Sequence, residues 1–539
     1  MTGNQPLQIM MLSPRVFPLH KLFLVLVTSL PFGTSTQTVL SLPPEHDQYG
    51  PSVESARANA NAIFNTIHSA TRQWGSSVHH NGVSVFPVTV PEGTLLYHGN
   101  AYAEVPKVPE WLAFEIEHSE NFARKIIFSS RSSSGVQAVN EPDALFPESR
   151  GPKKFDPGYL HVYQANRPLR LLYFDGMSAA TGSPLGTSDM QEYMFLNRTW
   201  NNDYGDIMPY AAALCKKGAE WGGVEGFVRM EAGFEIIKCN FSDGLDLISH
   251  NRRPHRATPE GQSEGWLFEW LRAVTLRYNG IDGSRIVVDF SSMIHAGFYP
   301  TNLTNPDPEN SHLPRLVSAD PAQVARIRSD VKSIWLEKTL QPTVDWQGVV
   351  DMIEKRFSDR LQYLATKPPS MSFLWEINVL LNTFINYESF SLEESIETCA
   401  SHYLRPVETS TWQDKLIHVA VKAVTTRICS SLFQVRANLL ARRNANGSEP
   451  EDTSKSVELI HELIAWLDWT AWRMCRPSCP YDQICLIAVS PFGNRDLHYN
   501  PRCVNSTGAS ESMSFDDNYW FDEDFSDKGE PPSSLLHGL

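Results

Sequence analysis

The sequence lacks the short motifs that mark the commonest enzyme classes. It contains no Gly-x-Ser-x-Gly nucleophile elbow, no P-loop, no Gly-x-Gly-x-x-Gly turn and no His-Glu-x-x-His pair. These absences disfavour the common serine hydrolases, nucleoside-triphosphate enzymes, dinucleotide oxidoreductases and zinc proteases. No internal repeat is present, which disfavours a solenoid or a propeller.

Positive charge is also scarce. Lys and Arg number 46 against 61 Asp and Glu, so the formal net charge is −15. A general nucleic-acid binder needs a basic surface to neutralise phosphates, and a polybasic membrane-surface protein needs a similar excess. We therefore expect no nucleic-acid partner. The chain is 42% hydrophobic and 11% aromatic, which is enough to form a sizeable core.

The first 44 residues contain no acidic residue. Arg15 and Lys21 precede the apolar run Leu22–Leu30, and small residues follow up to Thr36. This order predicts a secretory signal peptide over residues 1–36. The apolar run is about half the length of a transmembrane helix, although an uncleaved signal anchor remains an alternative. After cleavage we expect no stable membrane span, and we expect a secreted protein or one in the lumen of the secretory pathway.

Glycosylation sequons agree with that route. Asn-x-Ser/Thr triplets are acceptors for N-linked glycans in secreted chains. The predicted acceptors are Asn197, Asn240, Asn302, Asn446 and Asn505.

The eight cysteines also fit an oxidising compartment. Four of them crowd into a Pro-rich segment near the C-terminus, where a loop without periodicity needs cross-links. Their spacing lacks the paired pattern of a zinc site, so disulfides are favoured over a metal. The sequence leaves the pairing open among Cys215, Cys239, Cys399, Cys429, Cys475, Cys479, Cys485 and Cys503.

Hydrophobic periodicity changes along the chain and predicts an α+β fold with distinct parts. Strand-like runs dominate the first part, and long helical patterns poor in glycine dominate the second. We expect an N-terminal mixed α/β domain, an α-helical domain and a disulfide-stapled C-terminal segment. The predicted boundaries are 45–298 for the α+β domain, 299–321 for a linker, 322–475 for the helical domain, 476–504 for the Cys/Pro-rich segment and 505–539 for an acidic disordered tail.

One segment suggests chemistry. Leu-Tyr-His-Gly at 96–99 reads as a strand ending in a Gly turn, and residues 111–124 follow as a second strand and a short helix. Glycine at such a turn leaves the backbone bare for a ligand. This pattern resembles the first strands of ADP-ribosyltransferases. The resemblance implies that His98 and Gly99 contact the ribose of NAD, which is then a substrate; otherwise His98 is a hydrogen-bonded turn histidine.

The resemblance also implies a carboxylate on a late strand, where it stabilises an oxocarbenium-like transition state. Glu231 and Glu235, in the stretch 226–239, are the candidates. The alternative is a pair of structural carboxylates, with Arg229 as a salt-bridge partner. Ser-Thr-Ser does not occur in the sequence, and the stretch 226–239 lacks the Glu-x-Glu pattern of those enzymes.

A broader resemblance covers most of the mature chain. The stretches 171–179, 221–241 and 287–293 are similar to a family of secreted fungal glycoproteins of unknown activity. Two hypotheses follow: a non-catalytic structural or partner-binding glycoprotein, which is favoured, and an ADP-ribosyltransferase-like enzyme acting on a glycosidic bond of NAD. A hydrolase using Asp175, Asp206 or Asp289 is a third possibility.

Overall fold

A computed structural model describes most of the chain after the leader. The predicted signal peptide lies outside the described residues, and Leu40–Leu539 forms one compact unit. The described residues are 47–128, 153–181, 183–197, 207–253, 262–278, 280, 285–337, 344–446, 453–512 and 518–521.

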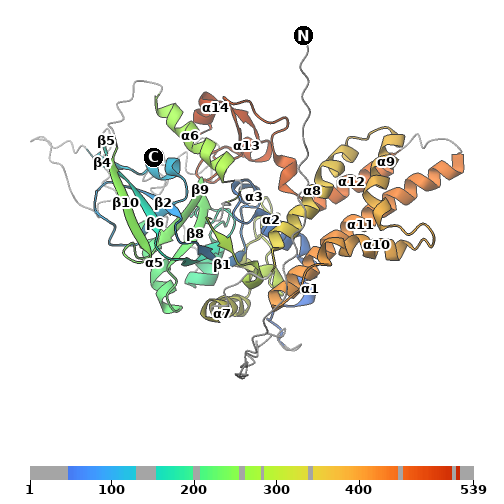
Figure 1. Cartoon of the computed structure of the whole chain (residues 1–539), viewed down its shortest axis with the longest axis horizontal. Helices are drawn as coiled ribbons and strands as arrows, with labels where there is room; N and C mark the ends of the chain where they lie inside the picture. The colour runs from blue at the N-terminus through green and yellow to red at the C-terminus, as the bar shows by residue number, and fades with distance from the viewer. Residues whose placement is uncertain are drawn as a thin grey trace, which may run out of the picture. The chain divides into compact units, whose positions relative to one another are not determined.

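A ten-stranded sheet organises the N-terminal half (Figure 1). All neighbouring strands are antiparallel except β7 and β8, which run parallel. Its order is β10 (Leu245–Arg252), β6 (Tyr159–Ala165), β2 (Leu95–Asn100), β3 (Glu110–Ala113), β9 (Gly233–Lys238), β8 (Gly226–Glu231), β7 (Leu169–Phe174), β1 (Ser84–Val90) and β11 (Val287–Val288), with β12 (Ile294–His295) also paired to β1.

Both faces of the central strands are buried, which explains why their sequences are nearly continuous hydrophobic runs. On one face Phe227 of β8 contacts Phe195, which belongs to the π-helix η1 (Met190–Leu196). On the other face Phe234 of β9 contacts Tyr173 of β7 and Tyr278, which follows α6 (Gln262–Arg277). Side chains at successive strand positions therefore point into opposite layers of the core.

Shorter elements complete this half. A separate two-stranded ribbon pairs β4 with β5, and short helices connect the strands. These elements are α3 (Gln73–Val78), α4 (Ile116–Glu120), β4 (Arg124–Phe128), β5 (Lys153–Pro157), α5 (Ile207–Glu220), η2 (Phe290–Ser292), η3 (Ala296–Phe298) and η4 (Leu316–Ser318).

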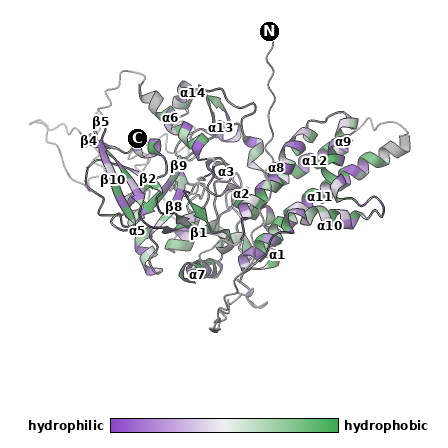
Figure 2. Ribbon diagram, in the orientation of Figure 1, coloured by the Kyte–Doolittle hydropathy of each residue, from purple (hydrophilic) through white to green (hydrophobic). Residues whose placement is uncertain are grey.

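The C-terminal half is helical, as the periodicity predicts. Figure 2 shows hydrophilic and hydrophobic residues alternating along several of these helices, which is the pattern of helices with one buried side. Together with the sheet, they confirm the α+β fold class. The helices are α7 (Pro321–Glu337), α8 (Trp346–Ala365), α9 (Ser370–Leu381), η5 (Asn382–Phe384), α10 (Leu392–Ser401), η6 (His402–Leu404), α11 (Trp412–Asn446), α12 (Ser454–Leu467) and η7 (Thr470–Arg473).

The N-terminal helices pack with this helical half and not only with the sheet. α1 (Val53–Ala58) and α2 (Ala60–Ser69) contact α11, and α2 also contacts α8. Asn59 separates the two helices. The first two described helices therefore pack against α11, which lies more than 300 residues later in the chain.

The predicted linker is packed against the sheet half. Arg315 is buried, and its Nε donates to Asp189 Oδ2 at 2.9 Å. Leu313 and Leu316 are buried beside it. The Pro- and Asn-rich composition of 299–321 indicates an irregular backbone, and three-dimensional contacts decide that this backbone is anchored.

Two disulfides hold the Cys/Pro-rich segment, Cys475–Cys485 and Cys479–Cys503. They flank a two-stranded sheet of β13 (Ile484–Leu486) and β14 (Arg502–Val504), with α13 (Arg495–Tyr499) between them. β13 packs on α6 of the N-terminal half.

The segment predicted as a disordered tail is ordered in part. It begins with α14 (Ser506–Glu511), which packs on α6, and Tyr519 and Trp520 are buried at 3% and 0% exposure. The interleaved aromatics outweigh the acidic charge here, because each buried ring removes a large apolar area from water. The remaining tail residues, 513–517 and 522–539, lie outside the described part.

One described helix, α11, meets the length and composition of a membrane-crossing segment. Its most apolar stretch is 56% buried within the protein, and the helix contacts α2, α9, α10 and α12. This burial is typical of the central helix of a bundle.

Candidate functional site

The predicted carboxylates lie on the hairpin formed by β8 and β9. Arg229 pairs in register with Glu235, and Glu231 pairs with Gly233. Cross-strand partners and residues two apart share a face of a sheet, so Arg229, Glu231 and Glu235 lie on one face. We call these three residues the carboxylate cluster.

Arg229 forms the ion pair that the sequence offers as the structural alternative. Its Nε donates to Glu235 Oε1 at 2.9 Å and its Nη2 to the same oxygen at 2.5 Å. Arg229 is 2% exposed and Glu235 7% exposed. Such a buried pair is stable only when its remaining donors are satisfied. The Nη1 atom meets this condition by donating to Gln191 Oε1 at 3.2 Å.

Glu231 differs from Glu235 in its environment. The pKa of Glu231 is raised to about 8, first by burial and then by the negative charge of Glu235, while Arg229 acts in the opposite direction. Burial and the nearby negative charge thus favour the protonated form of Glu231, which lies beside the ion pair of Arg229 and Glu235. Two carboxyl groups with environments this different are the usual basis of acid–base catalysis.

The turn between the strands is held by Gln73. Its Nε2 donates to Glu231 O at 2.7 Å, and its Oε1 accepts from Gly233 N at 2.9 Å. Gly233 has φ +111°, a conformation that favours glycine. These contacts fix the turn that lies between Glu231 and Glu235.

The sequence did not identify Gln191 or Gln73 as part of this arrangement. The chain forms the π-helix η1 at Met190–Leu196, which places Gln191 against Arg229. π-Helices are rare and occur frequently at functional sites. No local motif signals either glutamine, because their partners are far away in the chain.

His98 lies in a different environment. Its Nδ1 is 2.6 Å from Trp111 O, and its ring packs edge-on against His161 and beside Phe241. Burial lowers its pKa to about 4, so the ring is neutral at physiological pH. Its Nε2 is buried without a hydrogen-bond partner among the described residues.

The sheet places His98 and the carboxylates on opposite faces. Tyr97 pairs with Ala113, and Ala113 pairs with Glu235, so these three residues share one face. His98 is the next residue after Tyr97 and therefore points the other way. Strand β3 also separates β2 from β9, which puts their backbones about 10 Å apart. The structure does not bring His98, Gly99, Glu231 and Glu235 together around one ribose.

Gly99 has a packing role. A Cβ added there is 2.1 Å from Ser119 O, so the bare backbone accommodates the chain entering and leaving α4. The close approach that the sequence assigns to a ligand is made by the protein itself.

All eight cysteines form disulfides, which confirms the expectation from the sequence and resolves the pairing. Besides the two C-terminal bonds, Cys215 joins Cys239 and Cys399 joins Cys429. The sulfurs of Cys475, Cys479 and Cys485 lie within 4.8 Å of one another, as in a metal site. Since each is already bonded to another sulfur, none is the thiolate that zinc requires.

The described sequons are accessible. Asn197, Asn240, Asn302 and Asn505 are exposed. In three of them the side-chain oxygen accepts a backbone N–H: Asn240 from Ser242 at 3.0 Å, Asn302 from Thr304 at 3.0 Å and Asn505 from Gly508 at 2.9 Å. Asn446 lies in the last turn of α11, and its side chain is outside the description.

Part of the chain, which contains most strands of the sheet, is similar to a known family model. Residues 47–156 and 147–258 match the family described as the YPL277C N-terminal domain. This region includes both His98 and the carboxylate cluster.

Two curated proteins of the yeast Saccharomyces cerevisiae are similar to the chain. "Uncharacterized protein YOR389W" is 26% identical over 512 residues, covering 79% of this chain and 81% of the relative. "Uncharacterized protein YPL277C" is 34% identical over 252 residues, covering 42% of this chain and 50% of the relative. No solved structure matches. The comparisons support a relationship to fungal proteins of unknown activity, and neither relative's name states a reaction.

Proposed function

We propose that this protein is a glycoprotein of the secretory pathway that binds a partner rather than carrying out a reaction on NAD. The pairing of all eight cysteines carries the proposal, because such bonds form and persist in oxidising compartments. The leader sequence and the exposed sequons support the same route. The division of His98 and the carboxylates between two faces favours binding over NAD chemistry.

Expression of the full chain in yeast tests whether the protein enters the secretory pathway. We expect secretion into the medium, loss of the leader and a drop in apparent mass after treatment with an endoglycosidase. Asn240→Gln, Asn302→Gln and Asn505→Gln each remove one glycan. Asn386→Gln is the matched control, since Asn386 is exposed and is not in a sequon. A full-length, unglycosylated product retained in the cytosol with free thiols would overturn the proposal.

A second candidate function is acid–base chemistry at a glycosidic bond, with NAD as the first substrate to test. The observation that favours it is the contrast between Glu231 and Glu235 beside Arg229. In this reaction the bond between the sugar carbon and the nicotinamide nitrogen breaks, and nicotinamide leaves as a neutral molecule that takes no proton. The Glu235 carboxylate stabilises positive charge on the sugar carbon while water attacks it, and the ionised form of Glu231 accepts the proton that the water loses.

Release of nicotinamide from NAD by the purified full chain tests this function. If it operates, Glu231→Gln lowers the rate by about 100-fold or more. Glu220→Gln, on the exposed end of α5, leaves the rate unchanged. No release above the uncatalysed rate, or equal rates in the two variants, eliminates the candidate and leaves the proposed binding role intact.

A further inference from the structure

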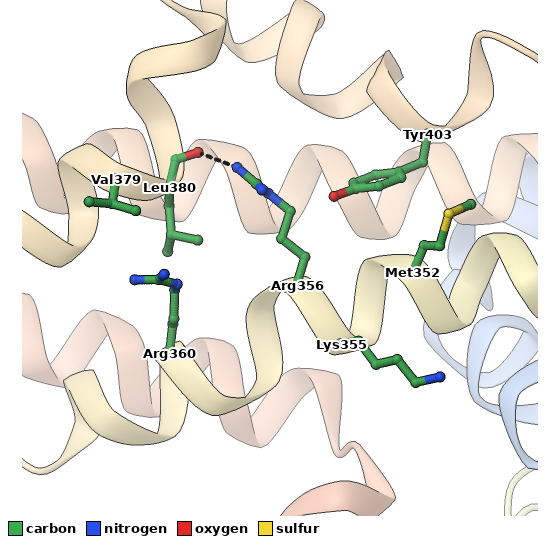
Figure 3. Close-up of a pocket in the computed structure, with 7 residues that line it drawn as sticks. All are labelled: Met352, Lys355, Arg356, Arg360, Val379, Leu380 and Tyr403. Atoms are coloured by element: carbon green, nitrogen blue, oxygen red, sulfur yellow. Dashed lines mark hydrogen bonds between the residues drawn. The ribbon is translucent and has the colours of Figure 1, made fainter. Parts of the chain in front are cut away.

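A surface pocket lies between α8, α9 and η6, well apart in the sequence from the carboxylate cluster (Figure 3). Its volume is about 510 Å³, which is within the range of small-molecule sites. It is lined by Met352, Lys355, Arg356, Arg360, Val379, Leu380 and Tyr403.

The pocket is positively charged in an otherwise acidic protein. Three of its residues are cations, and one of them, Arg360, forms an ion pair with Glu376 of α9. Lys355 and Arg356 have no carboxylate partner among the described residues. This local excess of positive charge favours the binding of an anionic ligand.

Arg356 occupies the middle of the pocket. Its Nη2 donates to Leu380 O at 3.1 Å, which holds the guanidinium in place, while its Nε is buried without a hydrogen-bond partner among the described residues. Figure 3 shows the Tyr403 hydroxyl directed toward the Arg356 side chain, whose guanidinium points to the Leu380 carbonyl. A guanidinium fixed in this way, beside a phenol and a lysine, matches the hydrogen-bonding needs of a carboxylate or phosphate.

An apolar stripe leads away from this charged centre along α9. Met371, Trp375 and Val379 are spaced four residues apart and are 60%, 60% and 38% exposed. Residues at this spacing lie on one side of a helix, over about 12 Å. Val379 also lines the pocket, so the stripe and the basic centre are continuous.

From this combination we propose that the pocket binds an anionic amphiphile. Its carboxylate or phosphate head group contacts Lys355, Arg356 and Tyr403, and its alkyl chain lies against Val379, Trp375 and Met371. The narrow stripe suits one chain better than a broad protein interface. This assignment rests on the proposed binding role and names the class of partner.

Calorimetric titration of the full chain tests the assignment with dodecyl phosphate as the probe. We expect dodecyl phosphate to bind at least tenfold more tightly than inorganic phosphate, which lacks the alkyl chain, and than dodecanol, which lacks the anionic head group. Vesicles of phosphatidylglycerol distinguish the source of the ligand: cosedimentation indicates capture at a membrane, whereas binding of dodecyl phosphate alone indicates a free amphiphile. Equal affinity for dodecyl phosphate and dodecanol overturns the proposal.

Paired variants locate the site. Lys355→Gln and Trp375→Gln change exposed residues, and each is expected to weaken binding of dodecyl phosphate by about tenfold. The controls Lys332→Gln and Leu336→Gln change an exposed lysine and an exposed leucine on α7 and leave binding unchanged. Binding that is equally strong in all four variants places the ligand elsewhere. Secretion and glycan processing are measured on the same variants, so failure here is separable from failure of the proposed route.

Discussion

At the scale of single residues, the burial of Arg229 decides the properties of the carboxylate cluster. The guanidinium lies between Glu235 and Gln191, almost fully removed from water. An ion pair in such a place contributes little net stability as a unit, but loss of one member leaves a buried charge without a partner. The cluster is therefore sensitive to any substitution that removes only one charge.

We expect Arg229→Met to lower the free energy of unfolding by about 3–5 kcal/mol, because Glu235 is left buried and unpaired. The control Arg502→Met removes an exposed arginine that pairs with Asp496 and costs less than about 1 kcal/mol. Urea unfolding followed by circular dichroism measures both. Similar losses in the two variants contradict the assignment of a buried, uncompensated charge.

At the scale of elements, the β8–β9 hairpin shows what local sequence predicts well and what it misses. Alternation of apolar residues predicts the strands, and the positive φ of Gly233 explains the glycine at their turn. The role of Gln73 is not predictable, because it clamps this turn from a helix 160 residues earlier in the chain. The same limit applies to the partly ordered tail, because the hydroxyl of the buried Tyr519 lies 2.7 Å from Nε2 of His80, 439 residues earlier in the chain.

Two glycines with positive φ allow the cost of backbone strain in a Gly→Ala substitution to be distinguished from the cost of steric crowding. A Cβ at Gly233 lies 2.6 Å from His118 Nδ1, whereas a Cβ at Gly223 meets nothing within 4 Å. We expect Gly223→Ala to cost about 1 kcal/mol from strain alone and Gly233→Ala to cost about 3 kcal/mol from strain and overpacking. Thermal unfolding measures the difference, and equal shifts in Tm show that the space near His118 does not matter.

At the scale of the whole molecule, buried titratable groups couple stability to pH. Burial lowers the pKa of five histidines to between about 2 and 4: His80, His98, His118, His295 and His498. Burial also raises the pKa of several carboxyls: Glu110 and Asp175 to about 7, Glu231 to about 8, and Asp189 and Asp289 above their usual range. The buried histidines and the buried carboxyls therefore change the stability in opposite directions as the pH changes.

Stability is expected to pass through a maximum near pH 6.5. Below this pH the unfolded chain binds protons at histidines that stay neutral when folded, so stability falls as the pH drops. The carboxyls with a raised pKa oppose this change, but they are fewer than the histidines, because the pKa values of His79, His161 and His418 are lowered as well. Above it, the folded protein keeps protons on carboxyls that are ionised when unfolded, so stability falls as the pH rises toward 8. Measurement of Tm from pH 4.5 to 8 tests the profile, and a Tm that rises steadily on acidification to pH 5 rules it out.

We expect the variant His295→Asn to lose less stability on acidification than the parent protein, so that its Tm falls less steeply below pH 6.5. His295 is buried, and its Nδ1 accepts from Gly297 N at 2.8 Å, a contact that an asparagine oxygen can replace. His250→Asn is the control, because His250 is exposed on β10. If both variants keep the slope of the parent protein, the buried histidines are not its source.

The sequence by itself determines the periodicity of each segment, the number of cysteines and the positions of the sequons, because these depend only on residue type and spacing. From them follow the α+β class, the order of sheet and helices, and the preference for disulfides over zinc. The tertiary structure alone decides which cysteines pair, which helices lie beside α11, and that His98 and Glu235 point to opposite faces. Those properties depend on strand order and register, which arise from contacts between residues far apart in the chain.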